Sequence, residues 1–558
     1  MWNPAEHCRG TREEHPPHDL FSRYARHHDA SIRQFQTRGS RVLTKHALRE
    51  SPWLLGVVAG LIGLWWRGYA FVPLPFISSY DWMEYVPSAW MVANHIDVGG
   101  YATWRNPLYP AILGHTGEWL GYNEAAWLLG SICMSMVVFS AGLGARALSN
   151  PWAGCVAAIT VPFINPWAEA SRWATLYPML TACTGLSLAC GAALARWGHP
   201  IWAITAGLFA GIGLGVDFRG AALVAAVIAM GALSSSRSIR MTSIAGLLVA
   251  LLFGPLMNNA VQISTQKETA EQVGTQRDLE IRLAIESGDV ELANACRNEP
   301  TDSAYPTIST LTRPCAWAFV KDNLVRFQDQ APFGVGFTLC LIPACLLARR
   351  RQWRRMLQSG FCMGAAWGAM FLMAVWARLN VHHFVQFAAP IAMTVPVAFA
   401  RIVDFSAPKP AKNTLHAVVA VLCIAWVTTQ GPWAGKPVSD LATGEQHQLL
   451  GWMLQGVERN MDEGDQLLDC SGMGVEAALL PRRLNDGHPN FQPSALTARC
   501  QSWISSPPNI KGNVWLLSRE EPGFNGPTPG QWRKAESWID GPRKTWMWLL
   551  VDTASGQP

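Results

Sequence analysis

Apolar runs of about 17 to 23 residues recur along this chain, and they constrain its fold more than any other feature. About 20 residues of helix, at 1.5 Å per residue, cross the ~30 Å hydrocarbon core of a bilayer. The composition agrees, because 50% of the residues are hydrophobic and only 15% are charged, whereas soluble domains are about 25% charged. The sequence therefore predicts a multi-pass α-helical membrane protein.

Apolar length and flanking charge together predict about eleven transmembrane spans. We expect them at approximately 53–72, 124–146, 152–167, 174–195, 200–216, 219–234, 242–262, 332–348, 356–377, 384–401 and 414–431. An odd number of spans places the two ends of the chain on opposite sides of the membrane. The predicted parts are a basic tail at 1–52, a transmembrane module at 53–431 with outer loops at 73–123 and 263–331, and an outer domain at 432–558.

Basic residues gather in alternating predicted loops. A solvated loop would explain any one cluster, but the alternation follows the positive-inside rule and places the N-terminus in the cytoplasm and the C-terminus outside. The clusters are the first 50 residues, Arg146, Arg196, SSSRSIR, ARRRQWRR, and Arg401 with Lys409 and Lys412. The net charge of +5 is too small to suggest a nucleic-acid partner.

The tail after residue 432 differs in character from the spans. Short apolar runs, in GDQLLDCSGMG, GNVWLLSRE and TWMWLLVDT, are separated by Gly, Pro, Asn and Asp. This pattern is typical of strands joined by turns, so we expect a small C-terminal α/β domain. The loop at 263–331 is charged and has helical spacing at Leu279, Leu283 and Leu292, which predicts helix over the membrane face.

Four cysteines fall in the predicted outer segments, in even pairs. Cys296 and Cys315 lie in the second outer loop, and Cys470 and Cys500 lie in the tail. If the outer face is oxidising, two disulfides are the simple expectation, and four unpaired thiols are the alternative. No spacing of Cys and His suggests zinc.

Two carboxylates, Asp81 and Glu84, follow the first span directly, in the stretch SSYDWMEYVPSAWMV. A carboxylate at a membrane boundary is costly unless it is solvated, paired or functional. Three residues apart, the two would share one face of a helix. They could simply end the span, or they could belong to a site.

The residues after this pair favour a site. The continuation SAWMVANHIDVGGYATWRNPLYPAILGHTGEWLG contains an amphipathic stretch at 85–94, a Gly-Gly turn and the segment NPLYP at 106–110. The arrangement resembles the GT-C superfamily of integral-membrane glycosyltransferases, especially its protein O-mannosyltransferase and aminoarabinose-transferase branches. Asp81 and Glu84 match the acidic motif of that superfamily, although here the motif is D-W-M-E and not an adjacent D-E pair.

Three later stretches fit the same comparison over residues 53–400. They are FINPWAEASRWATLYPMLTACTGLSLAC, which is similar to the second outer loop of the family, GLFAGIGLGVDFRGAALV, with Asp217 and Arg219 in a polar slot, and RLNVHHFVQFAAPIA, which resembles a late Arg-containing element. The resemblance implies a site at the outer boundary, with Asp81 and Glu84 as catalytic residues. The substrate-binding residues that it implies are Arg105, Tyr109, Glu169, Arg172, Asp217, Arg219, Arg378, His382 and His383.

The resemblance also implies a reaction. Members of this superfamily take a sugar from a polyprenyl-phosphate carrier, and the acceptor hydroxyl must lose a proton as it attacks the anomeric carbon. Asp81 is the expected general base, and arginines would stabilise the departing phosphate. Each Arg could instead snorkel or pair with a neighbour such as Glu169 or Asp217. The expected partners are the lipid-linked sugar, a glycan, lipid or protein acceptor, and membrane lipids. The expected location is the bacterial inner membrane. No cofactor is assigned, and a divalent metal is left open.

Other classes of function remain open from the sequence. A transporter or flippase would carry polar residues at mid-span, whereas the charges here collect at span ends and in loops. A polysaccharide polymerase or ligase is also fed by polyprenyl carriers, and a non-catalytic scaffold is the fourth alternative. The charges that distinguish a polymerase or ligase lie late in the chain, whereas here the acidic pair lies early.

Overall fold

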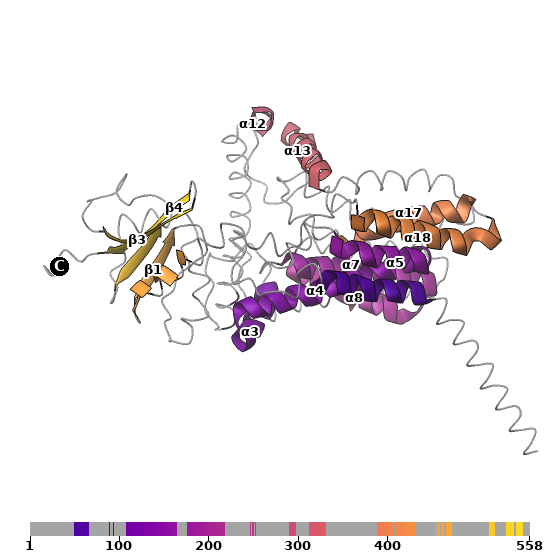
Figure 1. Cartoon of the computed structure of the whole chain (residues 1–558), viewed down its shortest axis with the longest axis horizontal. Coiled ribbons are helices and arrows are strands. Elements are labelled where there is room, and N and C mark those ends of the chain that lie inside the picture. Colours follow the sequence, from indigo (N-terminus) through magenta and orange to yellow (C-terminus); the bar gives the residue numbers. More distant parts are fainter. Residues whose placement is uncertain are drawn as a thin grey trace, which may run out of the picture. The chain divides into compact units, whose positions relative to one another are not determined.

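The structure is a computed structural model (Figure 1), in which the chain is divided into two units, residues 1–52 and 53–558. The residues that it describes are 50–65, 89, 93, 108–163, 176–217, 246, 248–249, 252, 290–296, 312–330, 388–406, 408–429, 452–453, 455–457, 459–462, 465–470, 513–518, 532–540 and 543–550.

Two long apolar helices form the centre of a helical bundle. Helix α4 spans Tyr122–Leu148 and α7 spans Tyr177–Trp197, and within the described residues these two are long and apolar enough to cross a membrane. The structure also contains shorter apolar helices at Glu50–Leu64, Pro151–Phe163, Pro200–Val216 and Lys412–Ala425. The expected total of about eleven spans stays a prediction, because several of them lie outside the described residues.

The remaining helices of the bundle surround α4 and α7. Helix α4 packs against α3, α5 and α17, α7 packs against α8, and α5 packs against α18. The bounds are α3 Leu108–Leu120, α5 Pro151–Thr160, η3 Val161–Phe163, α8 Pro200–Val216, α17 Ala388–Ser406, η7 Lys409–Ala411 and α18 Lys412–Thr429. The expected spans at 124–146, 152–167, 174–195, 200–216, 384–401 and 414–431 therefore coincide with helices, with shifted ends.

Local signals in the sequence start and stop these helices. The side chain of Asn150 accepts a hydrogen bond from the Ala153 amide at 3.0 Å, and Pro151 opens α5, which is a favoured combination at a helix N-terminus. Helix α7 ends at Gly198, whose φ of 70° lies in the left-handed region. Glycine adopts this conformation without a Cβ clash, so it suits the end of a helix.

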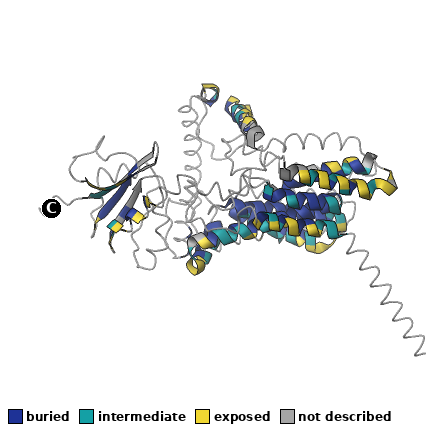
Figure 2. Cartoon of the chain, in the orientation of Figure 1, coloured by how far each residue is buried: buried dark blue, intermediate teal, exposed yellow. Residues whose placement is uncertain are grey.

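Small residues bring the central helices close together. Ala141 of α4 and Ala189 of α7 are fully buried, as is Ala206 of α8. The Ser187 hydroxyl of α7 donates to the Ala206 carbonyl of α8 at 3.2 Å. Figure 2 shows the buried residues concentrated where the helices of the bundle meet. Small side chains and hydrogen bonds between helices are the means by which helices associate in lipid, where apolar area alone gives little driving force.

The second predicted outer loop contains a disulfide-linked helical pair. Helices α12 (Val290–Cys296) and α13 (Pro314–Gln330) are joined by a Cys296–Cys315 disulfide. Leu292 and Phe319 are buried beside it, and Lys321 pairs with Glu291 at 2.7 Å. The second expected pair stays a prediction, because Cys500 lies outside the described residues.

The tail contains a four-stranded sheet in the order β1-β2-β4-β3. Strands β1 and β2 are parallel, and β4 is antiparallel to both of its neighbours. The bounds are β1 Gln466–Cys470, β2 Val514–Ser518, β3 Trp532–Asp540 and β4 Arg543–Leu550. The three apolar runs in the tail coincide with β1, β2 and β4, whereas β3 was not predicted from the sequence. The predicted boundary at residue 432 lies outside the described residues.

Short helical stretches at 452–453, 455–457 and 459–460 pack on this sheet. Gly456 lies so close to Trp538 that an added Cβ would come within 2.2 Å of the indole ring. Arg459 and Asn460 both donate to the Glu536 carboxylate, at 2.6 and 2.9 Å. The described part of the tail therefore contains helix as well as strand, as an α/β domain requires.

Candidate functional site

Helix α3 is the longest described part of the first outer loop, and it begins inside the NPLYP segment. Pro110 stands in its first turn, where a missing amide hydrogen costs nothing. Leu108, Tyr109 and Leu113 are buried, and the helix packs against α4 and α8. Helix α3 is therefore held firmly at the end of the bundle where α4 begins and α8 ends.

The segment that follows the acidic motif docks on α3. Its described residues, Ala89 and Ala93, are helical and buried. They face Gly114 of α3, where an added Cβ would come within 2.2 Å of the Ala89 carbonyl oxygen and 3.1 Å of the Ala93 Cβ. Ala89 and Ala93 thus contact α3 directly, and Ala89 follows Glu84 by five positions in the sequence.

Tyr109 is the predicted binding residue that the structure describes in α3. Only 3% of it is exposed, and it belongs to a buried cluster that also contains Leu176, Tyr177 and Val216. Burial raises the pKa of the Tyr109 phenol far above its usual value. The hydroxyl is therefore neutral at physiological pH, so it can donate a hydrogen bond but cannot act as a base.

Asp217 lies in the same part of the bundle, at the end of α8. Its amide donates to the Gly213 carbonyl at 2.9 Å, and its extended backbone ends the helix. The residue is 7% exposed, and it follows Val216, which shares the cluster of Tyr109. A buried carboxylate so close to a helix end is costly unless its neighbours satisfy it. The structure therefore brings Tyr109 and Asp217 to one end of the bundle.

The other predicted site residues lie outside the described residues. They are Asp81, Glu84, Arg105, Glu169, Arg172, Arg219, Arg378, His382 and His383. Their roles stay predictions. A divalent metal also stays a prediction, because no group of three or more His, Cys, Asp or Glu that could hold an ion occurs among the residues that the structure describes.

A second polar cluster, which was not predicted from the sequence, lies at the other end of α4. His416 Nε2 is 3.1 Å from Asp404 Oδ1, and Asn150 Nδ2 is 3.3 Å from His416 Nδ1. Lys412 donates to the Asp404 carbonyl. Helix α4 has 27 residues, or about 40 Å of length, so this cluster is remote from α3. The residues involved are up to 266 positions apart in sequence, and no local pattern links them.

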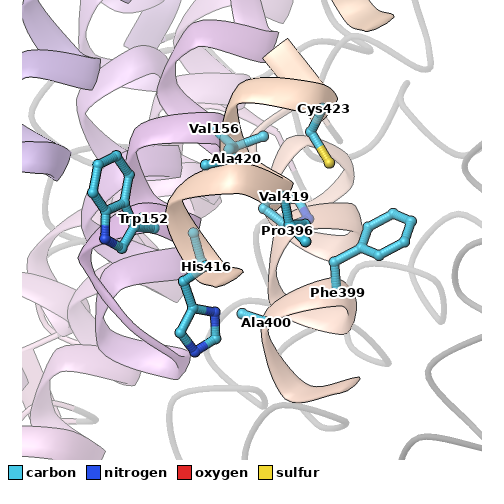
Figure 3. Close-up of a pocket in the computed structure, with 10 residues that line it drawn as sticks. Trp152, Val156, Pro396, Phe399, Ala400, His416, Val419, Ala420 and Cys423 are labelled. Carbon is cyan, nitrogen blue, oxygen red and sulfur yellow. The ribbon is translucent and has the colours of Figure 1, made fainter. Parts of the chain in front are cut away.

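This polar cluster borders a shallow pocket between α5, α17 and α18 (Figure 3). Its lining is apolar apart from His416, and it contains no charged side chain. The residues that line it are Trp152, Ala153, Val156, Pro396, Phe399, Ala400, His416, Val419, Ala420 and Cys423. Such a surface suits packing between helices better than the binding of a sugar phosphate, which needs charged or polar partners.

Comparison with known proteins identifies the fold. No family model and no curated protein matches the sequence. Among solved structures, ArnT from Cupriavidus metallidurans bound to undecaprenyl phosphate is similar, with a TM-score of 0.51 and 12% identity over 90% of this chain and 99% of that chain. Apo ArnT is similar with a TM-score of 0.50 and 12% identity, over 89% and 97% of the two chains.

An oligosaccharyltransferase from Archaeoglobus fulgidus in complex with Zn and sulfate is also similar, with 12% identity over 76% of this chain and 61% of that chain. Its TM-score is 0.43. The two ArnT structures have higher TM-scores, and ArnT is a GT-C glycosyltransferase. The chain therefore has a GT-C fold. The predicted resemblance is confirmed at the level of the fold.

Proposed function

We propose that this GT-C-fold membrane protein is a glycosyltransferase, which moves a sugar from a polyprenyl-phosphate donor to a hydroxyl of a glycan, lipid or protein acceptor. The observation that carries the proposal is the fold shared with ArnT over 90% of the chain, in a structure where ArnT holds undecaprenyl phosphate. A donor whose lipid lies in the bilayer requires a site at the membrane boundary, and α3 lies beside the end of α4.

The charge distribution supports an outward-facing site. Arg146 and Arg196 stand in the last turns of α4 and α7. The Arg401 guanidinium donates to the carbonyl of Leu148, at the same end of α4. Basic residues favour the cytoplasmic side, so we assign this end to the cytoplasm. The end that carries α3 and Asp217 then faces outward, which suits the bacterial inner membrane.

The proposed chemistry uses Asp81 as general base. The Asp81 carboxylate takes the proton of the acceptor hydroxyl, the hydroxyl oxygen bonds to the anomeric carbon, and the bond from that carbon to the phosphate oxygen breaks. Glu84 assists at the same face. The docking of Ala89 and Ala93 on α3 supports this arrangement, because it attaches the segment that follows both acids to a firmly held helix.

The leaving phosphate gains negative charge as the sugar departs, so it requires cationic partners. Arg105, Arg172, Arg219 and Arg378 are the proposed partners, and the fork of an Arg side chain matches two phosphate oxygens. Glu169 and Asp217 orient these arginines, and Tyr109, His382 and His383 complete the substrate-binding surface.

The test compares membranes containing the wild-type chain with membranes containing Asp81→Asn, supplied with polyprenyl-phosphate sugars from cells grown on labelled monosaccharides. We expect the wild type to release or transfer labelled sugar and Asp81→Asn to lose at least about 10²-fold of this activity. Asp404→Asn is the matched control. Asp404 belongs to α17 and lies near the end of α4 that is remote from α3, so this variant should keep the activity. Full activity of Asp81→Asn would refute the assignment of the base. No turnover by the wild type with any carrier would refute the proposed function.

A further inference from the structure

The contact between Gly114 and the segment at Ala89 and Ala93 leaves no room for a side chain. A Cβ at Gly114 would lie 2.2 Å from the Ala89 oxygen and 3.0 Å from the Ala89 carbonyl carbon. Both atoms belong to the backbone, so no side-chain rotation can relieve the contact. A carbon and a carbonyl oxygen approach to about 3.3 Å, and a methyl group at residue 114 would therefore require a movement of about 1 Å.

We expect the docked segment to take up much of this movement, although Ala89 is as fully buried as Leu113 of α3. Leu108 and Leu113 of α3 are 4% and 0% exposed, and the helix packs against both α4 and α8. Moving α3 would disturb these contacts at close-packed density. The docked segment, in contrast, directly follows the proposed catalytic acids, with Glu84 five residues and Asp81 eight residues before Ala89.

We propose that Gly114 is a positioning residue, which allows Ala89 and Ala93 to seat against α3 and, through the chain that precedes them, sets the reach of Asp81 and Glu84 toward the acceptor. This inference rests on the proposed glycosyltransferase function. A shift of about 1 Å at a reacting group can cost about 10²-fold in rate. Gly114 touches no reacting atom in this scheme, so it acts only through the segment that it seats.

The chain contains a matched control at Gly207 of α8. A Cβ at Gly207 would lie 2.0 Å from the backbone oxygen of Gly246 and 2.7 Å from its carbonyl carbon. The steric conflict is as severe as that at Gly114. Gly207 stands nine residues before the end of α8 at Val216, which is about 14 Å along the helix from the end that carries Asp217. Because the steric conflicts are equally severe, the effect of a new methyl group on stability should be similar at the two glycines.

The experiment measures kcat and the KM for the labelled polyprenyl-phosphate sugar, together with Tm, in the purified full chain. We expect Gly114→Ala to lower kcat about 10²-fold with KM changed less than about threefold. Gly207→Ala should lower Tm by as much or more and keep kcat within about threefold per folded molecule. Equal kcat losses in the two variants, or no loss in Gly114→Ala, would overturn the inference.

A second variant tests the same contact from the other side. Ala93 faces Gly114, so Ala93→Val adds methyl groups between the segment and α3, and we expect it to lower kcat with little change in KM. If Gly114→Ala fails to fold, a full kcat in folded Ala93→Val overturns the inference. The wild type separates the two proposals. If the wild type shows no turnover, the proposed function is refuted. If the wild type is active and the variants keep its kcat, the role of Gly114 is refuted.

Discussion

Removing the Cys296–Cys315 disulfide should destabilise the α12–α13 pair, by a free energy that depends on the length of the loop that the disulfide closes. The two cysteines are 19 positions apart, and closing a loop of this length stabilises the folded state by about 3 kcal/mol in the chain-entropy account. The few contacts around the bridge, mainly those of Leu292 and Phe319, form a small core. The disulfide is therefore a large part of what holds the two helices together.

Amide hydrogen exchange of the full chain in detergent measures this directly. In Cys296→Ala/Cys315→Ala we expect protection in α12 and α13 to fall about 150-fold, which is the factor that corresponds to about 3 kcal/mol. Amides of α4 should keep their protection, because stability is lost locally. The double variant avoids leaving one reactive thiol behind.

The control is Cys423→Ser, which alters a cysteine of α18 outside any disulfide. It should leave exchange in α12 and α13 unchanged. A loss of protection below about fivefold in the double variant would refute the reasoning, since it would mean that contacts other than the disulfide maintain the pair. Reducing agent added to the wild type should reproduce the effect of the double variant.

Two further predictions concern the bundle. Tyr109→Phe should reduce the decrease in the free energy of unfolding that occurs as the pH rises above about 10. The phenol stays protonated in the folded state, where burial raises its pKa, but ionises in the unfolded chain, so the wild type loses up to about 1.4 kcal/mol per pH unit there. Tm between pH 9 and 11 measures this, and equal slopes for both proteins would contradict it. Asn150→Ala should cost about 1 kcal/mol, because it removes the cap of α5. Chemical denaturation checks this against Asn413→Ala, an exposed site that should change stability by less than about 0.5 kcal/mol.

Helix positions were the most predictable part of the fold, because the start and stop signals are local. The expected span at 200–216 coincides with α8, which begins at Pro200 after the cap residue His199 and ends before Asp217. The expected span at 152–167 is too long as an α-helix, because α5 ends at Thr160. Pro162 explains the difference, since it lacks the amide hydrogen that the next turn needs.

Contacts between distant segments could not be predicted in the same way. Strand β3 was missed because it carries exposed charges, Arg533 and Lys534, where an apolar run was sought. Gly114 was missed because a glycine in a short helix carries no sign of what approaches it. Periodicity predicts the face of a helix but not the distance to its neighbour. Asp217 was predicted because a charge at the end of an apolar run is visible in the sequence itself.

Strand β3 also has a consequence for how copies of this protein meet. It lies at the edge of the sheet, bonded only to β4 in the described sheet. An open edge can pair with a strand of another molecule. Here the edge displays Arg533 and Lys534 and is interrupted by an irregularity between Lys534 and Glu536. Charged side chains and a break in the regular ladder both disfavour pairing along such an edge, so the tail can be crowded on a membrane surface without being drawn into intermolecular β-sheet.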